Sequence, residues 1–383
     1  MQSIVRIITF IGLTFLLSCS EPVTPIKVGV VLPLTGTYSL YGQQALKGAQ
    51  LAVEQINTQG GVKRRHIELI VRDNNTDPAK TVSSTRELIQ QHNVHALMGP
   101  ISSSSRYAMS DIASKYKIPM LYGIDYEGGH YDDYLVCYST IPEHYVDPII
   151  PYFIAANKTK FYIFGYDYIW PHRMAQRIKE SVDSNKGQIT GVEFTAFGVT
   201  DFRPVLERLE ASGSDMLMLT LPGTDGFEFI KQFRRFSFSQ PIDVIAFAAD
   251  ETYLMALDTE QLEGIYTPLH FFSQLSSDFT KKFITQYKQL HGKSSLVTYS
   301  SKAHYDLIYL LKEAIEKSDI ATHQQVMDNL HGLSRYTGAE KVTLRDDNHF
   351  DLPMYLGQFQ NGELKVIKHF GVITPPDQRP GAQ

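Results

Sequence analysis

The sequence predicts an α/β protein built from two doubly wound lobes. Short apolar runs with the composition of strands alternate with segments of helical periodicity, and this alternation continues to about residue 250. The first run, Ile26–Leu32, is almost continuously apolar and rich in β-branched residues, which is typical of a strand buried on both faces of a parallel sheet. At 383 residues the series is too long for one compact sheet, so we expect two lobes.

The first elements follow from their boundaries as well as from their periodicity. Apolar residues at helical spacing predict a helix over about 43–57, which Gly60-Gly61 ends. Asp77-Pro78 is typical of an N-cap residue followed by proline at the first helical position. The other elements expected in this part are a strand at 67–71, a helix to about 91, a strand at 96–99, a helix at about 104–116 and a strand at 119–122.

The same alternation predicts a second series of elements. Its strands are expected at 160–165, 191–194, 216–220 and 243–247, and its helices at about 173–185, 202–211 and 226–235. The C-terminal part differs, because long helices come first and short strands follow. These are helices at 277–290, 300–317 and about 323–330, and strands at 342–344, 354–358 and 364–369.

The N-terminus has the features of an export signal. Arg6 precedes an apolar run at residues 7–17, which is too short to span a bilayer and is typical of a signal-peptide core. Leu16-Leu17-Ser18-Cys19 resembles a bacterial lipobox, in which the cysteine is acylated and becomes the first mature residue. We therefore expect a signal peptide over 1–18, lipidation of Cys19, a tether over 19–25 and an anchored protein in the periplasm or cell envelope. The alternative is an ordinary signal peptide that ends at Cys19.

Composition and motifs argue against catalysis and against nucleic-acid binding. The net charge is −5 and no basic patch stands out, so no nucleic-acid partner is expected. The sequence lacks the HExxH, P-loop and Gly-x-Ser-x-Gly motifs, and the histidines are scattered, so we expect no enzyme, no cofactor and no metal site. Glu143-His144, in a proline-flanked loop, is a weak candidate for a base and its carboxylate. Cys137 is expected to be buried and unpaired.

Polar and aromatic residues gather where the predicted strands end, and in open α/β sheets ligands bind beyond the carboxyl ends of strands. Ser102, Ser103 and Ser104 open a helix, whose free N–H groups and hydroxyls would favour an oxygen of the ligand; simple N-capping is the alternative. Aromatic residues after the strand 160–165 form either a ligand wall or part of a core near the hinge. The further candidates at strand ends are Tyr122, Ile124, Asp125, Tyr168, Trp170 and Asp250.

Several of these segments resemble the type I periplasmic-binding-protein family, in its branched-chain amino acid, amide and urea branch. The resemblance covers about residues 26–370. Its carriers are Ile26-Lys27-Val28-Gly29 with Leu32-Pro33-Leu34-Thr35-Gly36, Gly48-Ala49 through Gly60-Gly61-Val62, Asp73 and Asp77-Pro78. Narrower segments are similar to the urea- and short-chain-amide-binding subgroup: Tyr126-Glu127-Gly128, Asp167-Tyr168-Ile169-Trp170-Pro171 and Asn348-His349.

The resemblance implies a domain plan and roles for site residues. Lobe 1 would comprise 26–141 and 273–345, and lobe 2 would comprise 142–272 and 346–372, with a three-strand hinge between them and a tail at 373–383. Ser103 would be the main ligand serine, Tyr122 a pocket tyrosine, Tyr168 and Trp170 an aromatic pair from the second lobe, and Asp250 a further ligand residue. Two departures from the amide binders are Ile101 at an aromatic position and Asp125 beside Ile124.

The function implied is that of an extracytoplasmic solute-binding lipoprotein, which closes on a small polar ligand and delivers it to the membrane permease of an ABC importer. Urea or a short-chain amide is the first expectation for the ligand. Asp125 would also suit a ligand ammonium group, so a branched-chain or other amino acid is the alternative. A sensor without transport, a small-amide hydrolase and a structural lipoprotein with an empty cleft are further alternatives.

Overall fold

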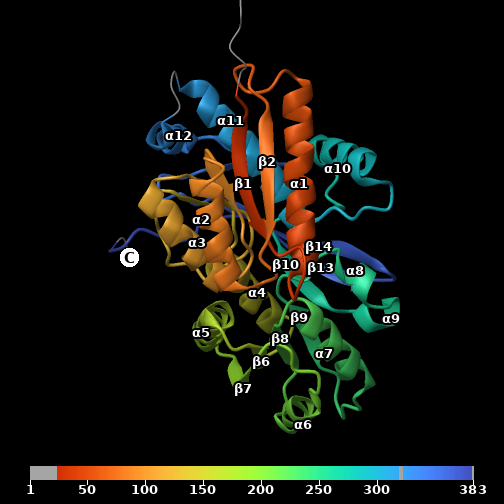
Figure 1. Ribbon diagram of the computed structural model, residues 1–383. Helices are drawn as coiled ribbons and strands as arrows, with labels where there is room; N and C mark the ends of the chain where they lie inside the picture. Colours follow the sequence, from red (N-terminus) through yellow and green to blue (C-terminus); the bar gives the residue numbers. More distant parts are fainter. Residues whose placement is uncertain (1–23, 319–321, 382–383) are drawn as a thin grey trace, which may run out of the picture.

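The computed structural model describes residues 24–318 and 322–381 as two α/β lobes, one above the other (Figure 1). The expected signal peptide and Cys19 lie outside the described residues. Within those residues, no helix has the length and apolar character needed to cross a bilayer. The two α/β lobes confirm the fold expected from the sequence for the described part of the chain.

Lobe 1 contains a parallel five-stranded sheet in the order β2-β1-β3-β4-β5. Its strands are β1 (Ile26–Leu32), β2 (Ile67–Asp73), β3 (Ala96–Met98), β4 (Met120–Tyr122) and β5 (Leu135–Cys137). Its helices are α1 (Ser39–Thr58), α2 (Pro78–Gln90), α3 (Ser103–Tyr116), α10 (Asp278–His291), α11 (Tyr299–Lys317) and α12 (His323–Leu330). A small hairpin, β11 (Ser334–Thr337) and β12 (Glu340–Thr343), lies beside α10.

Lobe 2 contains a seven-stranded sheet in the order β14-β13-β10-β9-β8-β6-β7, in which only β13 runs antiparallel to its neighbours. Its strands are β6 (Lys160–Tyr166), β7 (Gln188–Thr195), β8 (Met216–Thr220), β9 (Asp243–Ala246), β10 (Tyr266–Leu269), β13 (Leu352–Gln360) and β14 (Glu363–Ile373). Its helices are α4 (Pro142–Ala155), α5 (Ile169–Ser184), α6 (Arg203–Ala211), α7 (Thr224–Arg235), α8 (Tyr253–Ala256) and α9 (Thr259–Leu262).

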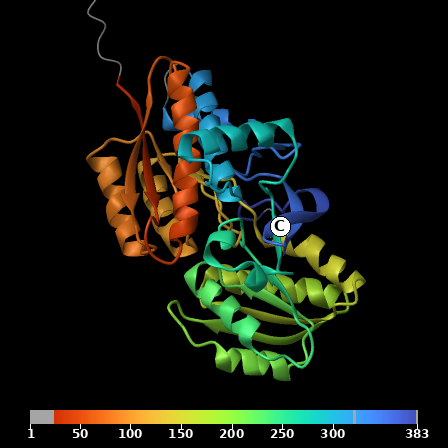
Figure 2. The ribbon, with the colours of Figure 1, turned by 90° about the vertical axis from the view of Figure 1, so that its right-hand side faces the viewer.

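Helices cover both faces of the lobe 2 sheet, which explains why its central strands are apolar throughout (Figure 2). Ile163 and Met218 belong to the same core cluster as residues of α4 and α5. Phe164 and Leu219, the next residues on the same strands, belong to the cluster that includes α6 and α7. Successive side chains of a strand point to opposite faces, so each strand must be apolar at every position.

Two close contacts show how the sequence sets the ends and the packing of helices in lobe 1. The Asp77 carboxylate accepts a hydrogen bond from the Ala79 N–H at 2.7 Å, which is the predicted N-cap of α2. At Gly48, α1 approaches α11 so closely that a Cβ atom would lie 1.9 Å from the carbonyl oxygen of Ser301. Only glycine fits there, because any side chain would push the two helices apart.

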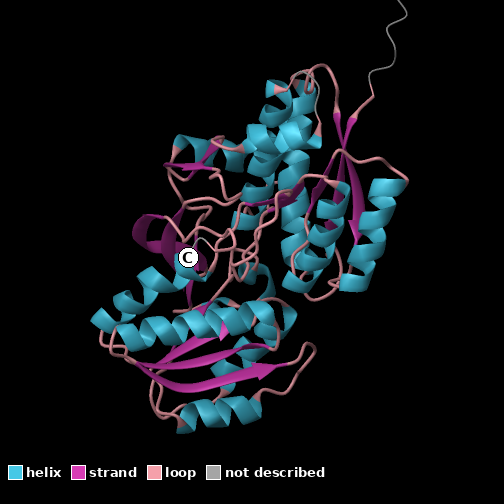
Figure 3. Ribbon diagram, turned by 90° about the vertical axis from the view of Figure 1, so that its left-hand side faces the viewer, coloured by secondary structure: helices cyan, strands magenta, loops and turns pink. Residues whose placement is uncertain are grey.

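The chain passes between the lobes three times, after β5, after β10 and before β13 (Figure 3). The connections are mostly loops joined by isolated bridges, such as Cys137 with His349, rather than three regular strands. Aromatic contacts tie them together: the ring of Tyr138 in the first connection lies 5.7 Å from His270 in the second and 4.5 Å from Phe350 in the third. The hinge region is thus a packed core.

Six elements were not expected from the sequence: β5, α4, α8, α9, β10 and β11. Helix α4 contains Pro148 and Pro151, and proline disfavours the interior of a helix, yet tertiary packing buries the apolar face of α4. The interpretation of Glu143-His144 as part of a loop was wrong, since both lie in the first turn of α4. The His144 ring accepts a hydrogen bond from the Ile141 N–H at 3.1 Å, so it caps the helix.

Candidate functional site

A small cavity lies between the two lobes and takes walls from both. The volume that the centre of a water molecule can reach is about 30 Å³, so the cavity holds very few waters. The two lobes therefore lie close together. Lobe 1 contributes Tyr38, Tyr41, Ile101, Ser102, Ser103, Ile124, Asp125 and Tyr299, and lobe 2 contributes Tyr168, Trp170, Pro222 and Ala248.

One wall of the cavity is the start of α3. Ser102 is the N-cap residue with an extended backbone, but its hydroxyl makes no capping hydrogen bond. The Ser102 Oγ atom is buried and has no partner among the described residues. The first N–H groups of a helix also lack partners within the helix, so this wall offers several hydrogen-bond donors to an oxygen of a ligand.

The Ser103 hydroxyl has a different role from the donor expected from the sequence. It donates to the Glu127 carboxylate at 2.6 Å, and that carboxylate also forms a fully buried ion pair with Arg106. The Arg106 guanidinium lies 4.3 Å from the ring centre of Tyr126 and 4.5 Å from that of Tyr107. Because the Ser103 hydroxyl donates its hydrogen to Glu127, its oxygen, in the cavity lining, is left to accept from a ligand N–H.

Asp125 places a carboxylate in the cavity wall. The Tyr299 hydroxyl donates to it at 2.8 Å, and the Thr140 hydroxyl donates to its other oxygen. Burial raises the pKa of Asp125 to about 6, and hydrogen bonds from Thr140, Tyr145 and Tyr299 limit that rise. The carboxylate is therefore mostly ionised at neutral pH, and none of the residues lining the cavity is a cation that could neutralise it.

Lobe 2 supplies an aromatic wall. Helix α5 begins at Ile169, earlier than expected, so Trp170 lies in its first turn and Tyr168 is its N-cap residue. The two rings stack with their centres 6.4 Å apart, and the Trp170 Nε1–H is buried without an acceptor among the described residues. The hydroxyls of Tyr38 and Tyr168 form a 3.2 Å hydrogen bond, which joins the two lobes directly.

The structure brings six of the residues proposed from the sequence together in the cavity lining, and leaves three outside it. Ser104 is exposed and belongs to no wall. Tyr122 lies behind the wall and donates its hydroxyl to the Ile101 carbonyl at 2.8 Å. Asp250 is fully buried and holds the Thr252 N–H at 2.9 Å. The six in the lining are Ser102, Ser103, Ile124, Asp125, Tyr168 and Trp170.

Asp250 and Glu251 form an unusual pair of acids behind the lobe 2 wall. Burial raises the pKa of Asp250 to about 8, with a further rise from the nearby Glu251 charge, and burial raises the pKa of Glu251 to about 7. One oxygen of each carboxyl group has no partner among the described residues. At neutral pH Asp250 is therefore mostly protonated in this conformation, and only Asp125 brings a full negative charge to the cavity.

Sequence reasoning missed several lining residues, most of which follow a strand. Tyr38 and Tyr41 come after β1, Pro222 comes after β8 and Ala248 comes after β9, so the rule that ligands bind at strand ends applies to them as well. Tyr299 had no such signal, because it belongs to the first turn of α11, far along the chain from Asp125. Within the described part of the chain, no cluster of three or more His, Cys, Asp or Glu residues could hold a metal ion.

Comparison with known families and proteins gives a consistent result. A family model described as "Periplasmic binding protein" matches residues 25–363. The Leu/Ile/Val-binding protein BraC3 of Rhizobium johnstonii is 30% identical over 96 residues, which is 25% of this chain and 26% of that protein. A leucine-, isoleucine-, valine-, threonine- and alanine-binding protein of Pseudomonas aeruginosa is 30% identical over 111 residues, 29% of this chain and 30% of that protein. The matches thus span less than a third of either relative.

Solved structures share the fold over almost the whole chain. The substrate-binding protein LivJ of Streptococcus pneumoniae, in complex with isoleucine, has a TM-score of 0.80 at 23% identity and covers 92% of this chain and 100% of its own. A solute-binding protein of Rhodopseudomonas palustris BisB5, in complex with 3,4-dihydroxybenzoic acid, has a TM-score of 0.85 at 21% identity and covers 94% of this chain and 100% of its own. At these identities the likeness concerns the fold.

Proposed function

Because this chain belongs to the periplasmic binding protein family, we propose that it binds a small amino acid between its lobes and delivers it to an ABC importer. The observation that carries the choice of ligand is the uncompensated Asp125 carboxylate in the cavity. A buried charge without a partner is costly, so the ligand that fits best brings a positive charge with it.

The rest of the cavity complements the other parts of an amino acid. The Ser103 hydroxyl donates to Glu127, so its oxygen can accept a hydrogen bond from the same ammonium group as Asp125. The start of α3, with the free Ser102 hydroxyl, offers donors to a carboxylate. Ile101, Ile124, Pro222 and Ala248 and the tyrosine rings leave an apolar remainder, which favours a small uncharged side chain.

Urea and short-chain amides, our first expectation, receive less support than the amino acid alternative. A neutral amide would leave the Asp125 charge unmatched, whereas an ammonium group neutralises it. The relatives found by sequence are named for Leu, Ile and Val, and none of those described above is named for urea or an amide. A benzoate, as in some structural neighbours, would bring a second negative charge to Asp125.

Binding would couple to movement of the lobes. Ser103 and Asp125 come from lobe 1, while Tyr168 and Trp170 come from lobe 2, so a ligand contacts the full site only when the lobes are closed. A ligand with these contacts shifts the population toward the closed form by its difference in affinity for the two states. In this proposal the closed form docks on the membrane permease, and a lipid at Cys19 holds the protein at the membrane.

A ligand screen tests the proposal. The mature protein is heated with leucine, isoleucine, alanine, urea, acetamide or benzoate, and hits are titrated by calorimetry. A binder at 100 times its Kd stabilises the folded state by about 2.7 kcal/mol, so we expect a higher Tm with one or more amino acids and no change with urea or acetamide. Stabilisation by urea alone would overturn the choice of ligand, and release of ammonia from acetamide would indicate a hydrolase.

A further inference from the structure

We infer that lobe 1 carries a second binding site, for a small aromatic carboxylate, in a cavity that shares no residue with the one between the lobes. Its volume is about 410 Å³, which is within the range of ligand pockets. Four elements of lobe 1 line it: the C-terminal part of α1, the first half of α10, the middle of α11 and strand β11. This inference does not depend on the proposed function.

The cavity has walls of aromatic rings, two of which are exposed. Phe279 on α10 and Tyr336 on β11 are 54% and 40% exposed, and their rings stack with centres 4.2 Å apart and planes within 4°. Large exposed apolar side chains are costly in water, and two of them beside one cavity favour a surface that another flat group covers. The other rings in the lining are Phe283, Tyr305 and Tyr309.

The polar groups of the cavity form a surplus of hydrogen-bond donors. The hydroxyls of Tyr305 and Tyr309 both donate to the side-chain oxygen of Gln55, at 2.8 and 2.9 Å. With its oxygen occupied in this way, the Gln55 amide is left with N–H groups that donate to nothing in the described part of the chain. Lys302 is only 4% exposed, and among the described residues its ammonium makes one hydrogen bond, to Asp306, out of three possible.

Arg335 adds further donors and a positive charge. One end of its guanidinium donates to Glu313, its plane lies 5.2 Å from the ring centre of Tyr309, and its Nε atom is buried without a partner among the described residues. The lining contains Lys282, Lys302 and Arg335 but only one acid, Asp306. The cavity is therefore positively charged and short of acceptors.

These features together select the class of ligand. A carboxylate supplies the missing acceptors and the negative charge, and arginine binds it well because the guanidinium and the carboxylate match in geometry. An aromatic ring on the ligand would lie against the protein's rings. Inorganic phosphate would satisfy only the donors, and an aromatic amine would satisfy only the rings while meeting positive charge. We therefore expect both probes to bind more weakly than benzoate.

Calorimetric titration of the whole mature protein with benzoate tests the site. We expect benzoate to bind, inorganic phosphate to bind at least tenfold more weakly, and benzylamine not to bind. Arg335→Gln should weaken benzoate binding by about tenfold or more, because a charge-assisted hydrogen bond is lost. Phe279→Ala, which changes an exposed ring, should also weaken it and keeps the test valid if Arg335→Gln does not fold.

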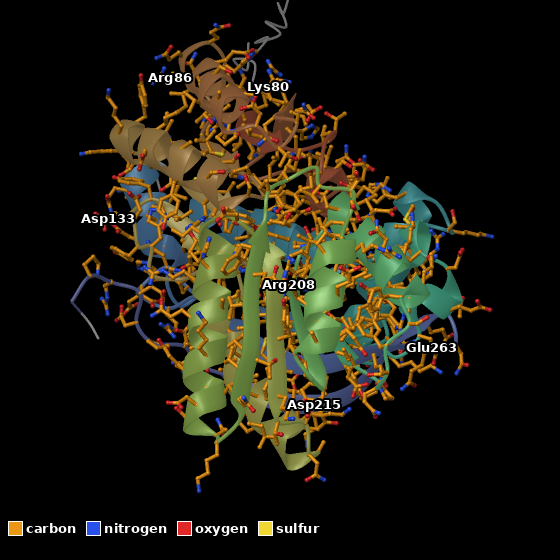
Figure 4. All side chains as sticks on the ribbon, turned by 90° about the horizontal axis from the view of Figure 1, so that it is seen from below. Lys80, Arg86, Asp133, Arg208, Asp215 and Glu263 are labelled. Carbon is orange, nitrogen blue, oxygen red and sulfur yellow. The ribbon has the colours of Figure 1, made fainter. Side chains whose placement is uncertain are left out.

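Two control variants decide which cavity is occupied. Arg208→Gln is matched to Arg335→Gln: Arg208 is an exposed arginine paired with Glu193 on the far side of lobe 2, where Figure 4 labels it, and benzoate binding should not change. Ser103→Ala should leave benzoate binding intact as well. Benzoate binding that is lost in Ser103→Ala but kept in Arg335→Gln would overturn the inference, as would no binding to the wild-type protein at millimolar benzoate.

Discussion

Asp125 is the residue in which the demands of binding and of stability oppose each other. Its carboxylate lines the cavity without a cation, and burial raises its pKa to about 6. Asp125→Asn should weaken amino acid binding by about 3–5 kcal/mol, because the ligand ammonium would lose its charged partner. The same change should raise the Tm of the empty protein at pH 7, because the folded state no longer holds an unpaired buried charge.

The effect of Asp125→Asn on stability should depend on pH in a direction that follows from the raised pKa of Asp125. The folded protein holds the Asp125 proton more tightly than the unfolded chain does, so the charge destabilises the fold above pH 6, and this penalty fades as the pH falls toward 4. The gain in Tm from Asp125→Asn should fade over the same range. Asp111→Asn, on the exposed face of α3, is the control and should change neither quantity. Unaltered ligand affinity in Asp125→Asn would remove Asp125 from the site.

The neighbouring serines at the start of α3 provide a matched pair. Ser103 is buried and turns toward the cavity, whereas Ser104 is exposed. Ser103→Ala should weaken ligand binding by about 1–3 kcal/mol, through the loss of one hydrogen bond, and Ser104→Ala should leave it unchanged. Calorimetry on both variants checks this. Equal losses would mean that the effect comes from the helix end and not from contact with the ligand.

The candidate residues show how far sequence reasoning reaches at this scale. The rule of strand ends located Ser103, Asp125 and Trp170 because each follows the carboxyl end of a strand in one of the two sheets. It could not tell Ser103 from Ser104, because which serine of a helix start faces inward depends on the angle between helix and sheet. It also could not predict that the Ser103 hydroxyl donates to Glu127. That contact depends on where Arg106, the ion-pair partner of Glu127, lies in the fold.

Among the elements, the C-terminal segment after β14 contributes more than the tail expected from the sequence. Arg345, in the third connection between the lobes, donates to the carbonyl oxygens of Pro375 and Pro376. The Gln378 N–H donates to Asp347 at 3.0 Å, and the Gln378 side-chain oxygen accepts from the Gly129 N–H at 2.6 Å. The segment thus ties the hinge region to the loop that carries Glu127.

Gln378→Ala should therefore affect both stability and binding. We expect a loss of about 1 kcal/mol in the free energy of unfolding, because the hydrogen bond from the Gly129 N–H is broken, and a severalfold loss in ligand affinity through the loosened loop around Glu127. Arg379→Ala is the control, since Arg379 is exposed and among the described residues pairs only with Asp377. Chemical denaturation and calorimetry give the two readouts. A change in stability without a change in affinity would make the segment purely structural.

Helix α4 shows why some elements escape prediction. Three prolines lie in this helix, at positions 142, 148 and 151, but the first lies at the helix start, where proline fits. The two inner prolines are tolerated because apolar side chains of α4 pack on the lobe 2 sheet, as Ile149 and Ile150 do. In contrast, α2 was predicted closely, since Asp77 and Pro78 act locally. Local sequence signals predict where a helix begins and ends. Tertiary packing overrides these signals only where a large apolar surface is buried.

Across the whole molecule, buried histidines gather where the lobes join. His144 begins α4, His270 lies in the second connection and His349 in the third. Burial lowers the pKa of His144 and of His270 to about 3 and that of His349 to about 4. The unfolded chain therefore binds these protons more readily, so the stability that neutral histidines allow is complete above about pH 6.5 and is lost as the pH falls toward 3–4.

The acids behind the cavity act in the opposite direction. Asp250 and Glu251 have pKa values raised to about 8 and about 7, whereas in the unfolded chain both ionise near pH 4, so their contribution to stability falls as the pH rises from about 4 to about 8. Between about pH 4 and pH 6.5 the acids and the histidines therefore oppose each other, and above pH 6.5 the acids alone should make stability fall until about pH 8. Urea denaturation between pH 4 and pH 9 measures the curve. Stability that stays constant between pH 6.5 and pH 8 would contradict the raised pKa values of the two acids.

His270 allows this explanation to be tested at one position. Both of its ring nitrogens are buried without a partner among the described residues, and it lies against the rings of Tyr138 and Tyr299, 5.7 and 5.5 Å between centres. His270→Phe keeps a flat ring there and removes the group that must stay neutral, so the free energy of unfolding should rise most at pH 4–5 and less at pH 7. His66→Phe, at an exposed position, should leave the pH profile unchanged. If His270→Phe shifted stability equally at both pH values, its effect would come from packing, and the acid sensitivity would arise from other buried histidines, such as His144 and His349.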